Sequence, residues 1–136
     1  MNQTQKDKKE GKVKKHENKY VIYCSQCGKK AAHFQVERNR GGKVSSISYS
    51  GKFSRTIEKE FMRKTVGYLK RDDIWGLDYY FSRHRVVDGG IDVYCPKCHK
   101  VYCPECWDSR IRFEEGGWYD CTYGVCPKGH EKIIDD

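Results

Sequence analysis

The chain has 136 residues, which is long enough for one domain, or for one domain with a tail, and 34% of the residues are charged. A run of about 18 apolar residues is absent, so the sequence predicts no membrane-spanning helix. The formal net charge of +8 predicts attraction to nucleic acid or another polyanion, although a basic tail that only aids solubility would give the same excess.

Residues 1–19 are rich in lysine and lack apolar periodicity. They contain seven Lys and three acidic residues, a net charge of +4, so the rest of the chain carries only the other +4. This composition predicts a disordered basic tail ahead of a folded domain at residues 20–136. The first ten residues also lack the apolar core of a secretory signal peptide. We therefore expect a cytoplasmic protein, or a nuclear one in a eukaryote, that is not secreted.

Two strands are predicted around the first pair of cysteines. The apolar run at residues 20–23 leads into Cys24 and Cys27, which form a CxxC pair followed by glycine. Residues 31–37 then predict a returning strand, and residues 39–42 predict a turn. A strand, a CxxC pair and a glycine in succession are typical of a metal-binding knuckle, because the tight turn needs a residue that tolerates positive φ.

Residues 43–94 form a long insert between the first and second cysteine pairs. Its serine-rich start, around Val44 and Tyr49, predicts an edge strand. A helix capped by Ser54 is predicted to run to about residue 70, with its apolar side chains sharing one face.

The end of the insert is predicted to be a β-hairpin. Residues 78–87 alternate in a way that predicts a strand, residues 88–90 form a turn signal, and residues 91–94 predict the partner strand. This hairpin would deliver the chain to the next cysteine pair. Residues 107–113 predict a further strand or a short helix, and the three tryptophans are expected in the core around the metal sites.

Four cysteines fall within the twelve residues 95–106, as two CxxC pairs four residues apart. Paired thiolates bind one ion from a tight turn, and Zn²⁺ prefers four such ligands in a tetrahedron. Each pair therefore needs a second pair from elsewhere in the chain. We predict two structural zinc ions as the cofactors, with the following ligands: Cys24, Cys27, Cys95, Cys98, Cys103, Cys106, Cys126 and His130.

The last ligand pair has an alternative. Cys126 and His130 flank a Pro/Gly turn and are the preferred pair, but Cys121 could replace His130 as the eighth ligand. The pairing of the knuckles is also open. In sequential wiring the Cys24/Cys27 pair joins Cys95/Cys98, whereas in cross-brace wiring it joins the pair at residues 103 and 106.

The run Cys95-x2-Cys98-x4-Cys103-x2-Cys106, with Tyr102 before the third cysteine, resembles the middle of RING-like and FYVE treble-clef fingers. It also resembles the C-terminal zinc region of the von Willebrand-type subunit of the factor TFIIH. The resemblance covers about residues 94–130 together with the first pair, and it implies cross-brace wiring. The last finger alone is similar to LIM domains, which are wired sequentially.

The sequence differs from these families at two positions that matter for their functions. FYVE fingers carry a basic run before the third cysteine that binds inositol phosphates, but residues 90–94 contain Asp92 and no basic residue. RING ligases have an apolar residue inside the first cysteine pair, where this chain has Ser25 and Gln26. Phosphoinositide binding is therefore not expected, and ligase function loses support.

Catalytic motifs are absent from the sequence. It contains no HExxH, Walker A, GxGxxG or GxSxG motif, and no deaminase signature. Sites with four protein ligands are closed to water and read as structural. We therefore expect no catalytic residues and no small-molecule substrate.

The expected fold is a small, β-rich α+β zinc domain, treble-clef-like or zinc-ribbon-like. Its expected function is a binding module for nucleic acid or a nucleoprotein assembly, and the alternative is a RING-like protein-interaction adaptor or a finger of the ubiquitin-like-ligase type. The basic residues expected to contact nucleic acid are Arg83 and Arg85, which lie among aromatic residues, and Lys14 and Lys15 in the tail.

Overall fold

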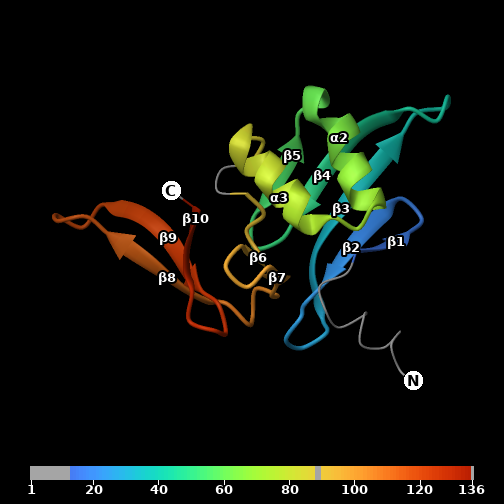
Figure 1. The fold of residues 1–136 in the computed structure, drawn as a ribbon. Helices are drawn as coiled ribbons and strands as arrows, with labels where there is room; N and C mark the ends of the chain where they lie inside the picture. Colours follow the sequence, from blue (N-terminus) through green and yellow to red (C-terminus); the bar gives the residue numbers. More distant parts are fainter. Residues whose placement is uncertain (1–12, 88–89, 136) are drawn as a thin grey trace, which may run out of the picture.

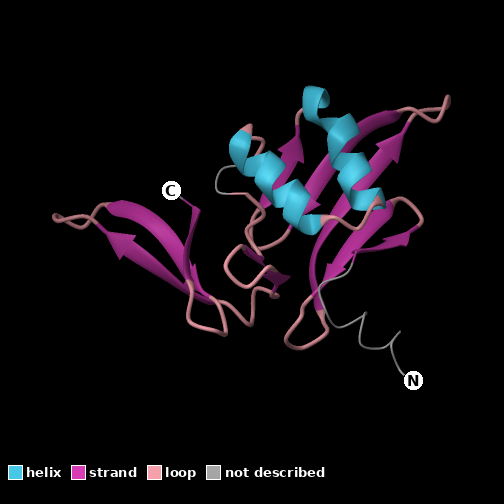
Figure 2. Ribbon diagram, viewed as in Figure 1, coloured by secondary structure: helices cyan, strands magenta, loops and turns pink. Residues whose placement is uncertain are grey.

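The computed structural model describes residues 13–87 and 90–135. Within these ranges the chain forms two helices and three antiparallel sheets, which confirms a small, β-rich α+β fold (Figures 1 and 2). Neither helix is long and apolar enough to cross a membrane.

The largest sheet has five strands that follow one another in chain order. They are β1 (Val13–His16), β2 (Lys19–Tyr23), β3 (Lys30–Arg38), β4 (Val44–Ser50) and β5 (Ser54–Ile57). Short turns join neighbouring strands, and every pair is antiparallel. The strands predicted around residues 20–23 and 31–37 are confirmed as β2 and β3.

Two helices, α2 (Lys59–Lys70) and α3 (Ile74–Arg83), pack on one face of this sheet (Figure 1). Strand alternation places Phe34 and Tyr49 opposite each other on the covered face, with ring centroids 4.9 Å apart. Leu77 and Phe81 of α3 are fully buried against this layer. The helices therefore close a single apolar core over the five-stranded sheet.

The insert differs from the sequence-based expectation in three elements. The strand β4 pairs on both sides, so it is not an edge strand. Residues 54–57 form β5 rather than the first turn of a helix, and α2 begins after them at Lys59. The predicted strand at residues 78–87 is wrong, because most of it belongs to α3.

The helix α3 has an N-terminal capping residue, Asp73, ahead of residues 78–87. The Asp73 side chain accepts a hydrogen bond from the Gly76 N–H at 2.8 Å and caps the first turn. Ile74, Leu77 and Phe81 then lie three and four residues apart and are buried, as expected for one helical face. The apparent alternation after residue 78 was a fragment of this longer helical pattern.

The prediction of a disordered tail over residues 1–19 is wrong for its last residues. Residues 13–16 form the edge strand β1, which pairs with β2, and β2 itself starts at Lys19. The Val13 N–H donates to the carboxylate of Asp72 at 2.8 Å and ties this edge to the turn between the helices. Residues 1–12 and the first two residues of the turn predicted at 88–90 lie outside the described residues.

The C-terminal part carries two smaller sheets. Strands β6 (Tyr94–Cys95) and β7 (Lys100–Val101) form a short hairpin, so the partner strand predicted at residues 91–94 is reduced to its last residue. Strands β8 (Asp108–Phe113), β9 (Tyr119–Val125) and β10 (Glu131–Asp135) form the third sheet. Its β8–β9 hairpin, coloured orange to red in Figure 1, projects away from the body.

The three tryptophans occupy different environments. Trp107 is buried, and its indole N–H donates to the carbonyl of Val93 at 3.2 Å. Trp75 and Trp118 are 58% and 74% exposed. The expectation that all three belong to the core is therefore wrong for two of them.

Candidate metal centres

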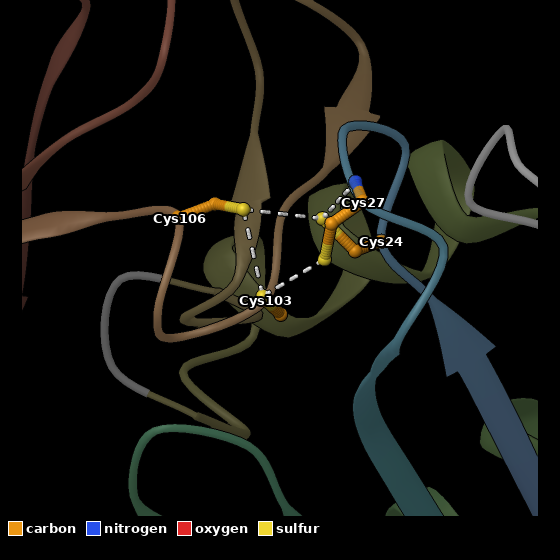
Figure 3. A group of neighbouring side chains, drawn as sticks. All are labelled: Cys24, Cys27, Cys103 and Cys106. Carbon is orange, nitrogen blue, oxygen red and sulfur yellow. Dashed lines mark hydrogen bonds between the residues drawn. The ribbon is translucent and has the colours of Figure 1, made fainter.

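The first centre gathers four cysteines from two knuckles that are far apart in the sequence. Cys24 and Cys27 follow β2, and Cys103 and Cys106 follow β7 (Figure 3). The four sulfur atoms all lie within 4.8 Å of one another. Their arrangement places four ligand atoms around one point, as tetrahedral metal binding requires.

The backbone shapes the first knuckle around the sulfur of Cys24. The Cys24 N–H donates to the carbonyl of Lys29 at 2.7 Å, and Gly28 closes the turn with a φ of 80°. The N–H groups of Gln26 and Cys27 point at the Cys24 sulfur from 3.3 and 3.5 Å. Burial acts to raise the pKa of this thiol, but backbone N–H donors outweigh it and lower the pKa to about 7.

The second centre combines three cysteines with one histidine. Cys95 and Cys98 lie on the β6–β7 turn, and Cys126 and His130 lie on the turn between β9 and β10. The Nδ1 atom of His130 is 3.2 Å from the sulfur of Cys98 and 3.5 Å from that of Cys126. One imidazole nitrogen therefore points into a group of three sulfurs.

The turn that presents Cys126 and His130 repeats the geometry of the first knuckle. The Cys126 N–H donates to the carbonyl of His130 at 2.9 Å, and Gly129 adopts a φ of 93°. The N–H groups of Lys128 and His130 point at the Cys126 sulfur from 3.3 and 3.4 Å. Although burial again acts to raise the pKa of Cys126, these donors lower it below its ordinary value.

The donor sets fit zinc. All eight cysteines are free thiols, and seven of them stand in the two groups. Burial raises the pKa values of Cys103 and Cys106 in the first centre, so four close thiolates need a cation among them to ionise together. Four sulfurs, or three sulfurs and an imidazole, are the ligands that Zn²⁺ takes in closed structural sites, where no position remains for water.

The knuckles pair in the cross-brace order. The first and third knuckles form one centre, and the second and fourth form the other, so residues 99–102 connect the two centres. Backbone contacts hold the centres together, since the Ser25 N–H donates to the carbonyl of Val101 at 2.8 Å and the Tyr102 N–H donates to that of Val93 at 2.9 Å. The ligand pairs are therefore not joined in the sequential order.

The alternative ligand Cys121 lies outside both groups. It is buried on β9, where its backbone pairs with that of Arg112 on β8. The structure thus places the imidazole of His130, and not this thiol, with the sulfurs of the second centre.

The four basic residues predicted to contact nucleic acid are not brought together. Lys14 and Lys15 lie on β1 at one edge of the large sheet, whereas Arg83 and Arg85 lie at the end of α3, toward the opposite side (Figure 1). Arg83 donates to the hydroxyl of Tyr79 at 2.8 Å, with its guanidinium 5.8 Å from that ring centre. Arg85 is exposed and has a φ of 54°.

Two groups of surface residues were not foreseen from the sequence. Trp75 stacks on His99, with ring planes 11° apart, and continues the exposed face of α3 toward the second centre. Lys59, Arg63 and Lys70 line a groove beside α2. Correct helix boundaries would have found the cationic row of α2, because residues four and seven apart lie on one helical face. The stack of Trp75 on His99 joins residues 24 positions apart, and no local pattern could have found it.

A buried polar cluster fastens β10 beside the second centre. The ammonium group of Lys132 donates to the carbonyls of Ile91 and Tyr94 at 2.5 and 2.6 Å. Asp78 of α3 accepts from the N–H of Ile91 at 2.8 Å. Burial raises the pKa of Asp78 and lowers that of Lys132, while the attraction between the two opposes both shifts.

A family model described as Domain of unknown function (DUF8328) matches residues 14–136. No curated protein and no solved structure matches the chain.

Proposed function

The chain belongs to this family, whose description names no activity, and we propose from its surface that it is a metal-stabilised binding module for nucleic acid. The two centres serve as structural zinc sites in a pair of treble-clef-like knuckles, with no catalysis of their own. Closed sites of this kind stabilise a fold without reacting with a substrate. The binding function must therefore come from surface side chains.

One observation carries this proposal: an exposed aromatic row on α3 with the Arg83 guanidinium beside it. Trp75 and Tyr79 are 58% and 56% exposed and lie four residues apart, so they share one helical face. Arg83 continues the row by a further turn, and His99 backs the indole of Trp75. Large aromatic faces that remain open to water beside positive charge are suited to stacking bases and contacting phosphates.

The net charge supports the same partner. The chain has 27 Lys and Arg against 19 Asp and Glu. Between described residues, the ion pairs are Lys29–Glu105 at 3.5 Å and Arg110–Asp108 at 2.8 Å, both on the surface. Most cations are therefore not neutralised by a carboxylate within the described parts of the chain, which favours binding to a polyanion.

Fluorescence anisotropy with labelled 12-nucleotide RNA and DNA single strands tests the proposal. Trp75→Ala and Tyr79→Ala should each weaken binding by about 1–3 kcal/mol, because each removes one stacking surface. Trp118→Ala is the matched control, since that tryptophan is also exposed but lies at the far hairpin. Absence of binding to any RNA or DNA at low salt would refute the nucleic-acid function.

A second candidate function is protein docking by the β8–β9 hairpin. Ile111, Phe113 and Trp118 are 56%, 60% and 74% exposed on this projecting element. Exposed apolar side chains grouped on one element are typical of protein interaction sites. This adaptor function would survive moderate salt and would be lost with Trp118→Ala, whereas nucleic-acid binding should fall steeply with salt and should survive this substitution.

A further inference from the structure

A groove of about 640 Å³ runs between α2 and the end of the β3–β4 hairpin. Five cationic side chains line it: Lys59, Arg63 and Lys70 from α2, and Arg38 and Lys43 from the hairpin. No acidic residue is among its lining residues within the described chain. The groove is therefore a concave surface with positive charge on both walls.

The α2 wall presents its cations as a row. Residues 59, 63 and 70 are separated by four and seven positions, so they project from one helical face and span about 16 Å along the axis. All three are exposed. The acidic residue of the helix, Glu60, belongs to the face beside Tyr80 of α3, where its charge contributes to raising the pKa of that phenol after the larger effect of burial. Lys64 lies on that same side, with its ammonium 5.9 Å from the centre of the Tyr80 ring, so the acidic residue of the helix is kept off the groove face.

The hairpin wall contributes two cations, and a hydrogen bond holds one of them, Arg38, in place. Arg38 donates to the carbonyl of Gly42 at 2.9 Å, across the turn that joins β3 and β4. Lys43 follows that turn and is exposed. No ion pair joins Lys43, Lys59, Arg63 or Lys70 to a carboxylate among the described residues. These charges remain available to an external anion.

The floor of the groove is apolar and contains a glycine. Val44, Met62 and Val66 lie between the two cationic walls. Gly67 also lines the groove, within α2, where glycine costs about 1 kcal/mol relative to alanine. A Cβ atom there would meet only the tip of the Arg71 side chain, at 3.4 Å, so packing does not require the glycine. A ligand that approaches the helix backbone would require it.

We propose that this groove binds the sugar-phosphate backbone of a single-stranded nucleic acid, with the two cationic walls contacting phosphates and the apolar floor contacting sugars or bases. The assignment rests on the proposed nucleic-acid function and names a second, separate contact surface for it. The groove is lined by α2 and the aromatic row belongs to α3. These two helices cover the same face of the large sheet (Figure 1).

Charge and size favour a strand over a small anion. Successive phosphates of one strand are separated by about 3.4 Å along a stacked helix, so a row of about 16 Å spans several of them. A single phosphate would leave most of the five cations without a partner. A concave groove with an apolar floor also suits a single strand, whose sugars and bases are accessible, better than a duplex, whose outer surface presents mainly phosphates.

The test measures anisotropy of labelled 12-nucleotide single strands across a salt series. The groove triple Lys59→Gln, Arg63→Gln and Lys70→Gln should weaken binding at least about tenfold at low salt and reduce the slope of log K against log salt by about 2. The control triple Lys30→Gln, Lys97→Gln and Lys128→Gln removes the same charge from exposed positions on or beside the metal knuckles, outside the groove lining. It should change the slope by much less.

The outcomes separate the two proposals. If the wild type binds no nucleic acid, the proposed function is wrong. If the wild type binds and Trp75→Ala weakens it, but the groove triple behaves like the control triple, only the groove assignment is wrong. A duplex that binds the groove tighter than either single strand, with equal sensitivity to the triple, would overturn the choice of a single strand.

Gly67→Gln separates binding from folding, because it should change the stability of the protein and its affinity for nucleic acid in opposite directions. Glutamine is a good helix former, so this variant should unfold at a higher urea concentration than the wild type. Its side chain should enter the groove and weaken binding several-fold. If stability rises while affinity for single strands is unchanged, the close approach of a strand to this helix is refuted.

Discussion

At the scale of single residues, His130 and Cys121 differ in what they contact. His130 lies among three sulfurs with its Nδ1 atom, whereas Cys121 is buried in the β-sheet away from both centres. His130→Ala should therefore reduce the bound metal from two ions to one, and Cys121→Ser should leave two. Native mass spectrometry of the purified variants measures this directly. Two ions in His130→Ala together with one in Cys121→Ser would contradict the ligand set.

The hydroxyl of Tyr49 supports the buried carboxylate of Asp92. Tyr49 is fully buried and donates to one oxygen of Asp92, while the N–H of Phe53 donates to the other at 2.7 Å. Tyr49→Phe should lower the free energy of unfolding by about 1–3 kcal/mol, because the carboxylate loses a partner that water cannot replace. Urea denaturation checks this, with Tyr23→Phe as a control that should change stability by less than about 0.5 kcal/mol.

The same pair explains a glycine that the sequence alone marks only as a turn. A Cβ atom on Gly51 would lie inside contact distance of both the Tyr49 hydroxyl and the Asp92 carboxylate. Residue spacing was sufficient to single out the eight side chains that gather into the two centres. It could not reveal this glycine or the partner of Asp92, because both depend on residues about 40 positions apart.

At the scale of elements, Lys132 fastens β10 to the segment from Ile91 to Tyr94, the first residue of β6. Its ammonium group donates to two carbonyls there and neighbours the carboxylate of Asp78 on α3. Lys132→Met should destabilise the fold by about 3–5 kcal/mol, because it leaves a buried carboxylate without its opposite charge. Lys128→Met, at an exposed position of the preceding turn, should have little effect on the urea midpoint.

A double variant separates charge from packing at this contact. Adding Asp78→Asn to Lys132→Met should recover part of the lost stability, since the uncompensated charge is then removed. Equal costs for the single and the double variant would mean that Lys132 stabilises β10 by packing alone.

The elements differ in how well the sequence predicted them. Strands β2 and β3 carry short alternating runs bounded by a turn and a cysteine pair, and such local signals were sufficient. For α3, a local alternation after residue 78 competed with a helical pattern that begins at Ile74 and is fixed by burial against the sheet. For β5, the partner strand β4 supplies the hydrogen bonds, and no feature of residues 54–57 announces it.

At the scale of the whole molecule, stability has two sources. The five-stranded sheet and its helices share an apolar core that includes Phe34, Ile47 and Phe81. The strand β8 of the third sheet is almost wholly exposed, so we expect this sheet and the knuckles beside it to depend more on the two centres. Zinc contributes about 10–16 kcal/mol to the folding of small zinc-finger peptides near neutral pH, which is comparable to the total stability of a domain.

Removal of the metal should therefore destabilise the C-terminal region more than the large sheet. With a chelator, hydrogen exchange measured by mass spectrometry should become fast across residues 93–135, while the central strands β3 and β4 should keep much of their protection. Readdition of zinc should restore slow exchange. Uniform protection of the C-terminal region in the chelated protein would show that the centres are dispensable for folding.

The order of the knuckles along the chain has a consequence for biosynthesis. The first cysteine pair shares its centre with residues 103 and 106, so the ribosome must add 82 residues after Cys24 before that ligand set is complete. Until then the nascent polypeptide exposes the thiols of Cys24 and Cys27 without their partner ligands, and oxidants can join such thiols into disulfides. Cells that make this protein under oxidative stress should accumulate newly made chains with non-native disulfides. The folded, metal-bound protein should be far more resistant to thiol oxidation.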